Sequence, residues 1–130
     1  MRLGLVLLAV ALTACGGPTG PERTLIHFNN FRVGPRDLTY TDFTPAQSGT
    51  LIVVVDWTFP SNSMITALST PSCDFFTGGH GCGSFFAQSR GRKPAEFRYA
   101  GTIAGQAYRT WVANEGAQPD SGVINVYLER

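Results

Sequence analysis

The sequence has few charged residues and no clear excess of either sign. Lys, Arg, Asp and Glu make up 15% of the 130 residues, and the formal net charge is +1. A chain without a basic excess lacks the attraction to phosphates that dominates nucleic-acid binding, which excludes a nucleic-acid partner. Hydrophobic residues make up 43%, far too many for a disordered chain. The composition and the length are those of one globular domain.

The sequence also lacks an apolar run long enough to cross a bilayer. Its longest run, Leu3–Leu12, has about half of the ~20 residues that a membrane-spanning helix needs. One positive residue, Arg2, precedes this run, and the small residues Thr13 and Ala14 follow it. This order predicts a secretory signal peptide over Met1–Ala14.

The signal ends in the motif Leu12-Thr13-Ala14-Cys15. It resembles the lipobox of bacterial lipoproteins, in which a Leu stands three positions before the Cys and a small residue directly precedes it. The resemblance implies that the chain is cut before Cys15, that Cys15 carries a diacylglyceryl group, and that membrane lipid is its partner. Because Gly16 rather than Asp follows, the resemblance implies delivery to the outer membrane if the envelope has two membranes. The alternative is a plain secreted protein that is cleaved near a Cys.

A short segment without large apolar side chains follows the lipobox. Gly16–Arg23 contains three Gly and two Pro, a composition typical of a tether. We therefore expect residues 1–14 to be the signal peptide, residues 15–23 to be the lipidated Cys and the tether, and residues 24–130 to be the folded domain.

Cysteine is scarce, with three in the chain. If Cys15 carries lipid, Cys73 and Cys82 are the only possible pair, and an exported chain lies in an oxidising compartment. Eight residues separate the two, so a disulfide between them would stabilise the fold by about 2–3 kcal/mol. One alternative is that both thiols are free. The other is a zinc site that adds Asp74 and His80 to these cysteines, but the spacing lacks the close pairs of structural zinc sites. We therefore predict a disulfide, no metal and no other cofactor.

No segment shows a sustained apolar period of 3.6 residues, which argues against long helices. Instead, 15 Gly and 8 Pro separate short segments in which side chains of different polarity alternate. Turn signals recur roughly every ten residues, which predicts an antiparallel β-sandwich. The expected strands are Thr24–Val33, Asp37–Phe43, Thr50–Phe59, Ser63–Thr70, Glu96–Ala100, Gln106–Asn114 and Ser121–Glu129.

The alternation also assigns side chains to faces. In Thr50–Phe59, one face is wholly apolar and is expected inside, and the other face is mixed, which indicates partial cover by a neighbour. The inward residues of this strand are Leu51, Val53, Val55, Trp57 and Phe59. In Thr24–Val33, Leu25 is expected on the same face as His27 and Phe31.

Two of these segments carry a family resemblance. Gly49–Trp57 has the pattern Gly-x-Leu-x-Val-x-Val-x-Trp, and Ala104–Asn114 is similar to a later strand written Ala-Gly-x-Tyr-x-x-x-Val-x-Asn. Both resemble bacterial pre-peptidase C-terminal-type domains, and the similarity covers about Phe43–Glu129. It implies a small jelly-roll-like sandwich, here with about seven to nine strands. The acidic run that usually follows the Trp strand is replaced by Ser63–Thr66, which weakens the case for calcium binding.

Motifs of common catalytic sites are missing. The sequence has no Gly-x-Ser-x-Gly, no phosphate-binding loop, no dinucleotide-binding glycines and no His-Glu-x-x-His. Ser84 lies near His80, but this pair in a Gly-rich loop does not make a triad. We therefore expect no catalytic activity. A small secreted hydrolase, or its accessory domain, is an alternative.

Two groups of residues form the candidate binding surface. Neighbouring side chains on a strand point to opposite faces, so one ring of each Phe-Phe pair is expected at the surface, where rings stack on sugars or apolar partners. The nearby cations would attract anionic headgroups or an acidic partner. The alternative is structural, with buried rings and a solvated turn. The candidates are Phe75, Phe76, His80, Phe85, Phe86, Arg90, Arg92 and Lys93.

Together these features predict an envelope lipoprotein whose domain serves in binding or in structure, without catalysis. The runner-up is a glycan-binding module, with a glycan or an envelope protein as the partner.

Overall fold

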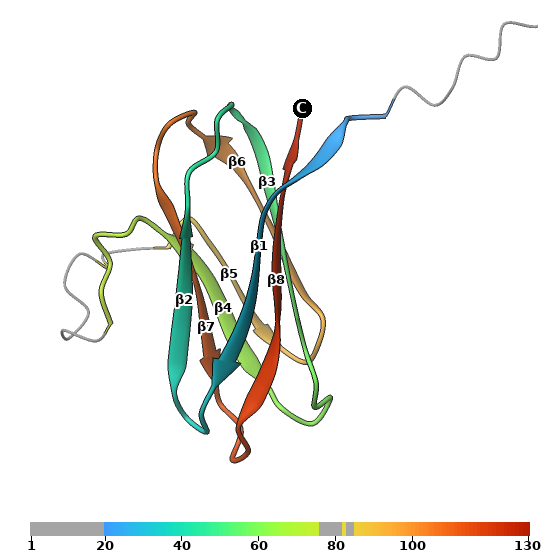
Figure 1. Ribbon diagram of the computed structural model, residues 1–130, viewed down its shortest axis with the longest axis vertical. Coiled ribbons are helices and arrows are strands. Elements are labelled where there is room, and N and C mark those ends of the chain that lie inside the picture. Colours follow the sequence, from blue (N-terminus) through green and yellow to red (C-terminus); the bar gives the residue numbers. More distant parts are fainter. Residues whose placement is uncertain (1–19, 76–81, 83–84) are drawn as a thin grey trace, which may run out of the picture.

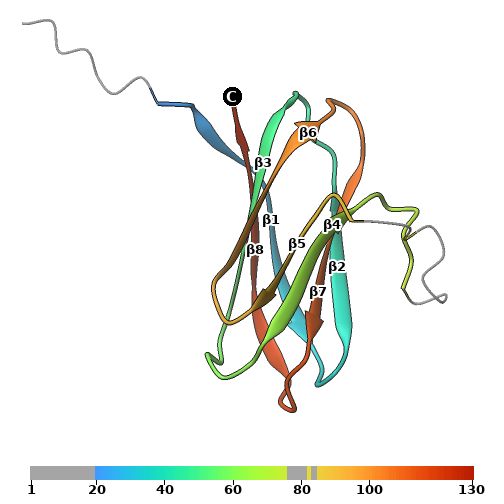
Figure 2. The same cartoon turned by 180° about the vertical axis from the view of Figure 1, so that it is seen from behind.

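The computed structural model describes residues 20–75, 82 and 85–130, and their regular structure is entirely β-strand. Two four-stranded antiparallel sheets pack face to face (Figures 1 and 2), which confirms the predicted all-β sandwich. The strands are β1 (Arg23–Val33), β2 (Leu38–Phe43), β3 (Gly49–Trp57), β4 (Met64–Ser69), β5 (Ala87–Gly91), β6 (Ala95–Thr102), β7 (Tyr108–Asn114) and β8 (Asp120–Glu129). Over these described ranges, no helix has the length and the apolar character that crossing a membrane requires.

The chain passes between the sheets after almost every strand. Sheet A has the order β1-β8-β3-β6 and sheet B has the order β2-β7-β4-β5, so only β4 and β5 follow each other within one sheet. This eight-strand arrangement is the jelly roll. It brings Gly20–Glu22, Arg130 and the loops 44–48 and 103–107 to one end of the sandwich, which we call the terminal end (Figure 1). The β1–β2, β3–β4 and β7–β8 loops lie at the opposite, distal end.

Alternating apolar side chains fill the space between the sheets. The inward residues predicted for β3 are buried as far as Trp57. The prediction is wrong for Phe59, which is 42% exposed. The strand ends at Trp57, and the backbone then turns, with the Asn62 N–H donating to the Phe59 carbonyl oxygen over 3.0 Å. On the other face of β3, Ile52 is fully buried at the position paired with Tyr127 and Arg98.

The alternation predicted for the first strand is wrong at its start. The pairing of β1 with β8 shifts between Leu25 and His27, because a β-bulge adds one residue there. The extra residue reverses the two faces, so Leu25 pairs with Tyr127 on the outer face, and His27 faces inward. The His27 ring stacks on Phe43 with 5.5 Å between ring centroids.

The sequence pattern did not predict β5. Ala87–Gly91 has no apolar alternation, since it reads Ala-Gln-Ser-Arg-Gly. It pairs with β4 at the edge of sheet B, where a strand buries little of its surface. Arg90 of the candidate surface therefore lies on an edge strand, and Arg92 and Lys93 lie in the following turn.

Candidate binding pocket on the outer face of sheet B

A small apolar cluster lies on the outer face of sheet B, the face turned away from the core. Two rows of paired residues cross this face: Tyr40, Trp111 and Ala67 in one row, and Leu38, Ala113 and Ile65 in the next. The described part of the β4–β5 connection packs onto the first row through Cys73, Cys82 and Phe85. Side chains of this connection thus cover part of a sheet face that would otherwise be exposed to solvent.

The β4–β5 connection is held by its two cysteines. The Sγ atoms of Cys73 and Cys82 lie 1.95 Å apart, which is the predicted disulfide. Cys73 is buried in the cluster. The connection also carries Phe75 and Phe85, whose ring centroids are 5.6 Å apart. The disulfide therefore closes the loop that carries Phe75, and Phe85 follows three residues after it.

Trp111 is the centre of the aromatic contacts. The Phe75 ring meets it edge-on with 4.9 Å between centroids, and the Tyr40 ring lies 5.1 Å away on the other side. The Trp111 indole N–H donates to the Ser69 hydroxyl oxygen over 3.0 Å. This polar group is therefore already satisfied inside the protein, and the indole presents only apolar surface to a ligand.

Arg109 lies in the adjacent row on the same face, between Asp42 and Ser69. Its guanidinium donates to both carboxylate oxygens of Asp42, over 2.6 and 2.8 Å, and to the Cys73 carbonyl oxygen over 3.3 Å. The guanidinium carbon lies 3.7 Å from the centroid of the Tyr40 ring. The hydrogen bonds that Arg109 donates to Asp42 raise the pKa of Arg109, against the opposing effect of burial. This planar pair ties the loop to β2 and β7.

A pocket of about 300 Å³ lies between the loop rings and the second row of side chains. It exists where the short side chains of Ala67 and Ala113 leave space among bulkier neighbours. Its walls are Leu38, Ile65, Ala67, Phe75, Phe85, Gln88, Trp111 and Ala113. All of these except Gln88 have apolar or aromatic side chains. The volume is at the lower limit of small-ligand pockets, which span about 300–1,000 Å³.

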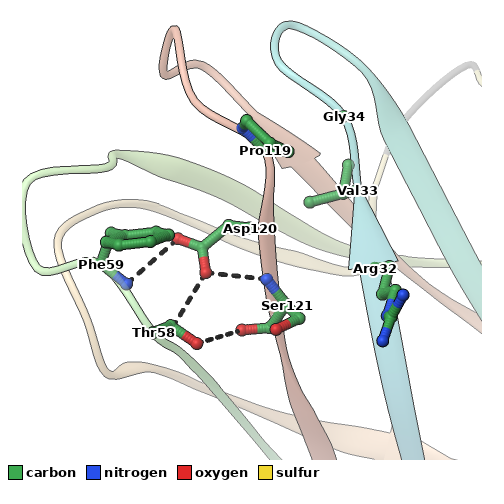
Figure 3. Close-up of a pocket in the computed structure, with 8 residues that line it drawn as sticks. All are labelled: Arg32, Val33, Gly34, Thr58, Phe59, Pro119, Asp120 and Ser121. Atoms are coloured by element: carbon green, nitrogen blue, oxygen red, sulfur yellow. Dashed lines mark hydrogen bonds between the residues drawn. The ribbon is translucent and has the colours of Figure 1, made fainter.

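A larger hollow of about 430 Å³ lies at the distal end (Figure 3). Its only carboxylate belongs to Asp120, which is 5% exposed. One oxygen accepts from the N–H groups of Thr58 and Ser121, and the other accepts from the Phe59 N–H and the Asn62 amide. Four donors of the protein already bind this carboxylate, so it holds the β3–β4 loop in place and is not positioned to bind a ligand.

The predicted phenylalanines do not form one surface. Phe75 and Phe85 line the pocket on sheet B. Phe86 points the other way and stacks on Tyr99 with 4.9 Å between centroids. Phe76, His80 and Cys15 lie outside the described residues, as does Ser84 of the hydrolase alternative.

The predicted cations are not among the residues that line the pocket, although Arg90 is paired with Ile65, one of its walls. Arg90 pairs with Glu115, and its Nε donates to that carboxylate over 3.0 Å. Lys93 donates to the Trp57 carbonyl oxygen and lies 3.1 Å from an Asp56 carboxylate oxygen. These two cations therefore already have acidic partners on the surface, and Arg92 is exposed.

Sequence reasoning missed Tyr40, Arg109 and Trp111. Their strands were predicted, and strict alternation places Arg109, Trp111 and Ala113 on one face. That signal shows which residues share a face, but not that a loop folds back over it.

Among residues 20–75, 82 and 85–130, no group of three or more His, Cys, Asp or Glu side chains is placed to hold a metal ion. A scan against protein-family models and a search of curated proteins found no match for this chain. The resemblances to the lipobox and to pre-peptidase C-terminal-type domains stay predictions.

Proposed function

We propose that the chain is a lipid-anchored lipoprotein of the bacterial envelope, with a non-catalytic binding domain whose site is the pocket on sheet B. The pocket carries the binding part of this proposal, because it is the place where a built apolar hollow and aromatic walls coincide. The anchor is supported by the sequence Leu12-Thr13-Ala14-Cys15, and Gly16 supports the outer membrane as its destination where two membranes exist.

The chemistry of the pocket favours an apolar group as the ligand. Sugar hydroxyls need hydrogen-bonding partners when they are buried, at a cost of about 1–3 kcal/mol for each one left unpaired. Gln88 is the only lining residue with a polar side chain apart from the indole, whose N–H is bound to Ser69. An aromatic ring or a short acyl segment, on a small molecule or on an envelope protein, fits this lining.

The anchor is tested by replacing the thiol that would carry the lipid. Cys15→Ser should move the protein from the membrane fraction to the soluble fraction, because no acyl chain then holds it in the bilayer. Mass spectrometry of the wild-type N-terminus should show an acylated Cys15. Membrane attachment that is unchanged in Cys15→Ser would contradict the anchor.

The pocket is tested by filling it. Ala113→Leu places three extra carbon atoms among the lining side chains, and the matched variant Ala100→Leu adds them on the exposed face of β6. The neutral fluorescent probe N-phenyl-1-naphthylamine should bind wild type and Ala100→Leu equally, and Ala113→Leu about tenfold more weakly, which is 1.4 kcal/mol. Equal probe binding by all three folded proteins would show that this pocket is not the site.

A glycan-binding module is the second candidate, and one feature favours it. Tyr40 is 40% exposed beside the planar Arg109–Asp42 pair, so an aromatic face lies next to polar groups. Such a combination suits a sugar ring. Binding to a polysaccharide panel that is lost in Tyr40→Ala, and kept in Ala113→Leu, would support this candidate over the apolar ligand.

A further inference from the structure

The connecting loops at the two ends of the sandwich differ in charge. At the terminal end, the loops 44–48 and 103–107 have the sequences Thr-Pro-Ala-Gln-Ser and Ile-Ala-Gly-Gln-Ala, without a charged residue. The distal loops and their flanks carry charges of both signs: Arg36, Asp37, Arg92, Lys93 and Glu115. The β4–β5 connection also leaves from the terminal end, but its described part runs sideways onto sheet B (Figures 1 and 2).

One of these two uncharged loops carries an apolar side chain on a fixed turn. Ile103 is 58% exposed, more than any other large hydrophobic residue in the part of the chain that the structure describes. The Gln106 N–H donates to the Ile103 carbonyl oxygen over 3.2 Å, and Gly105 has a φ of 79°, which closes a tight turn. The Ile103 N–H donates to the Tyr108 hydroxyl oxygen over 2.9 Å, which fixes the backbone at this position.

The two uncharged loops are tied into one surface. The Gly105 N–H donates to the Pro45 carbonyl oxygen over 2.8 Å, and the Ala104 N–H donates to the Ser48 hydroxyl oxygen over 3.2 Å. A large apolar side chain that is exposed on a turn contributes no hydrophobic stabilisation. Full burial of such a side chain against an apolar phase would contribute about 1.5–3 kcal/mol. An apolar phase beyond this end would supply that free energy.

The start of β1, at the opposite edge of sheet A from β6, adds a second exposed apolar side chain near this end. Leu25 is 49% exposed on the outer face of sheet A. Next to it, the Arg23 guanidinium lies over the Tyr127 ring, 4.4 Å from its centroid. Arg and Tyr are side chains that place an apolar body in a bilayer interface and keep the polar tip in water. The carboxylates at this end have cationic neighbours, Arg130 for Glu22 and Arg98 for Glu129.

The distance to the lipid is set by the chain itself. Seven residues connect Cys15 to Glu22, and a fully extended chain spans at most ~3.6 Å per residue, or about 25 Å in all. Glu22 is held at the terminal end by two backbone hydrogen bonds with Arg130, of 3.1 and 3.2 Å. A lipid on Cys15 thus keeps this end, rather than the distal end, near the bilayer.

We infer that the terminal end is a lipid-contacting surface, with Ile103 at the boundary between headgroups and acyl chains of the bilayer that anchors the protein. The inference rests on the proposed lipidation of Cys15. The tether brings the surface to the membrane, and the uncharged loops let it lie there without burying an unpaired charge.

The test places a fluorescent reporter at each end of the lipidated protein. Ile103→Trp reports on the terminal end, and Phe59→Trp is the matched variant, since Phe59 is an exposed hydrophobic residue at the distal end. Both are incorporated in vesicles of phosphatidylethanolamine and phosphatidylglycerol, with or without brominated acyl chains. Wild type, with Trp57 and Trp111 buried, supplies the emission to subtract.

We expect brominated chains to lower the added Ile103→Trp emission about twofold and to leave that of Phe59→Trp unchanged, since interfacial groups sit about 5–10 Å into the bilayer. Equal quenching of the two reporters in protein that floats with the vesicles would overturn the lipid-contacting surface and leave the anchor intact. Protein that does not float, with an unmodified Cys15, would overturn the anchor and this inference together.

Discussion

Asp120 is the first residue of β8, and its side chain binds the loop that follows β3. Replacing it by Asn tests how much these hydrogen bonds contribute to stability. Its two oxygens accept hydrogen bonds from three backbone N–H groups, of Thr58, Phe59 and Ser121, and from the Asn62 amide, over 2.8–3.2 Å. Asn has the same shape but only one acceptor oxygen. Its NH₂ group would face two donors, whichever way the amide is turned.

The expected loss of stability follows from the two hydrogen bonds that the Asn NH₂ group cannot accept. A hydrogen bond to a charged group contributes about 1.5–3 kcal/mol, and a buried donor without an acceptor is itself costly. Local movement and water recover part of this, so we expect Asp120→Asn to lower the free energy of unfolding by about 3 kcal/mol. For a domain of this size, the melting temperature should fall by about 10 °C.

The loss should depend on pH in a defined direction. Burial disfavours the charged form of Asp120, but the bonds from Asn62, Ser121, Thr58 and Phe59 outweigh it and lower the pKa of this carboxyl. A lowered native pKa means that the stabilisation is complete above the unfolded-state value of about 3.9 and is lost as the pH falls through the native value. The stability gap between wild type and Asp120→Asn should therefore be constant near neutral pH and close below about pH 4.

Urea unfolding of both proteins at pH 7 and at several values between about pH 5 and 2 measures this gap. Asp37→Asn is the matched control, because Asp37 is exposed and its carboxylate accepts one backbone N–H, from Leu38. The control should change stability by less than about 0.5 kcal/mol. An Asp120→Asn protein as stable as the control at pH 7 would refute the reasoning.

Three further changes test other parts of the fold. Replacing Cys73 and Cys82 together by Ser should lower the free energy of unfolding by about 2–3 kcal/mol, measured in urea, and an unchanged midpoint would contradict this. Partial burial lowers the pKa of His27, so the unfolded state takes up a proton first and stability should decrease as the pH falls through about 6.5. Thermal unfolding between pH 8 and 5.5 should show this decrease, and His27→Gln should reduce it; the same decrease in both proteins would exclude His27 as its source. A Cβ on Gly122 would lie 2.0 Å from the Asp56 carbonyl oxygen, so Gly122→Ala should separate β8 from β3 and prevent stable folding. A cooperative thermal transition near that of wild type would argue against the close approach.

The central strands of sheet A were the most predictable part of the fold. β3 is paired on both sides and faces the core with every second residue, so its apolar face is the buried one, and Ile52 is the residue of the other face that is also buried. β5 could not be predicted in this way. Its one neighbour is β4, and its five residues, Ala87–Gly91, hold their place by backbone pairing rather than by an apolar face.

The β1 bulge and the pocket escaped prediction because both depend on contacts between distant parts of the sequence. His27 and Asn29 gave Thr24–Val33 two mixed faces, so nothing local indicated where the register shifts. For the pocket, the Phe-Phe pairs indicated aromatic surface near the disulfide, but not the face it covers. That face is set by the β4–β5 connection packing onto Trp111, about 30 residues further along the chain.

The connectivity of the jelly roll relates the two proposed surfaces to each other. β1 and β8 are neighbours in sheet A, so the chain enters and leaves the domain through that sheet at the terminal end. The pocket is lined by the outer face of the other sheet, and its lining residues are on the strands and the β4–β5 connection rather than on the loops 44–48 and 103–107 or the distal loops. With the terminal end against lipid, the pocket would open parallel to the bilayer plane. A protein-borne apolar group could then reach it from a neighbour in the same leaflet, whereas a free acyl chain would have to leave the bilayer. The protein should therefore bind N-phenyl-1-naphthylamine with the same affinity when it is free in solution and when it is anchored on vesicles. That result would agree with a site that is separate from the anchor.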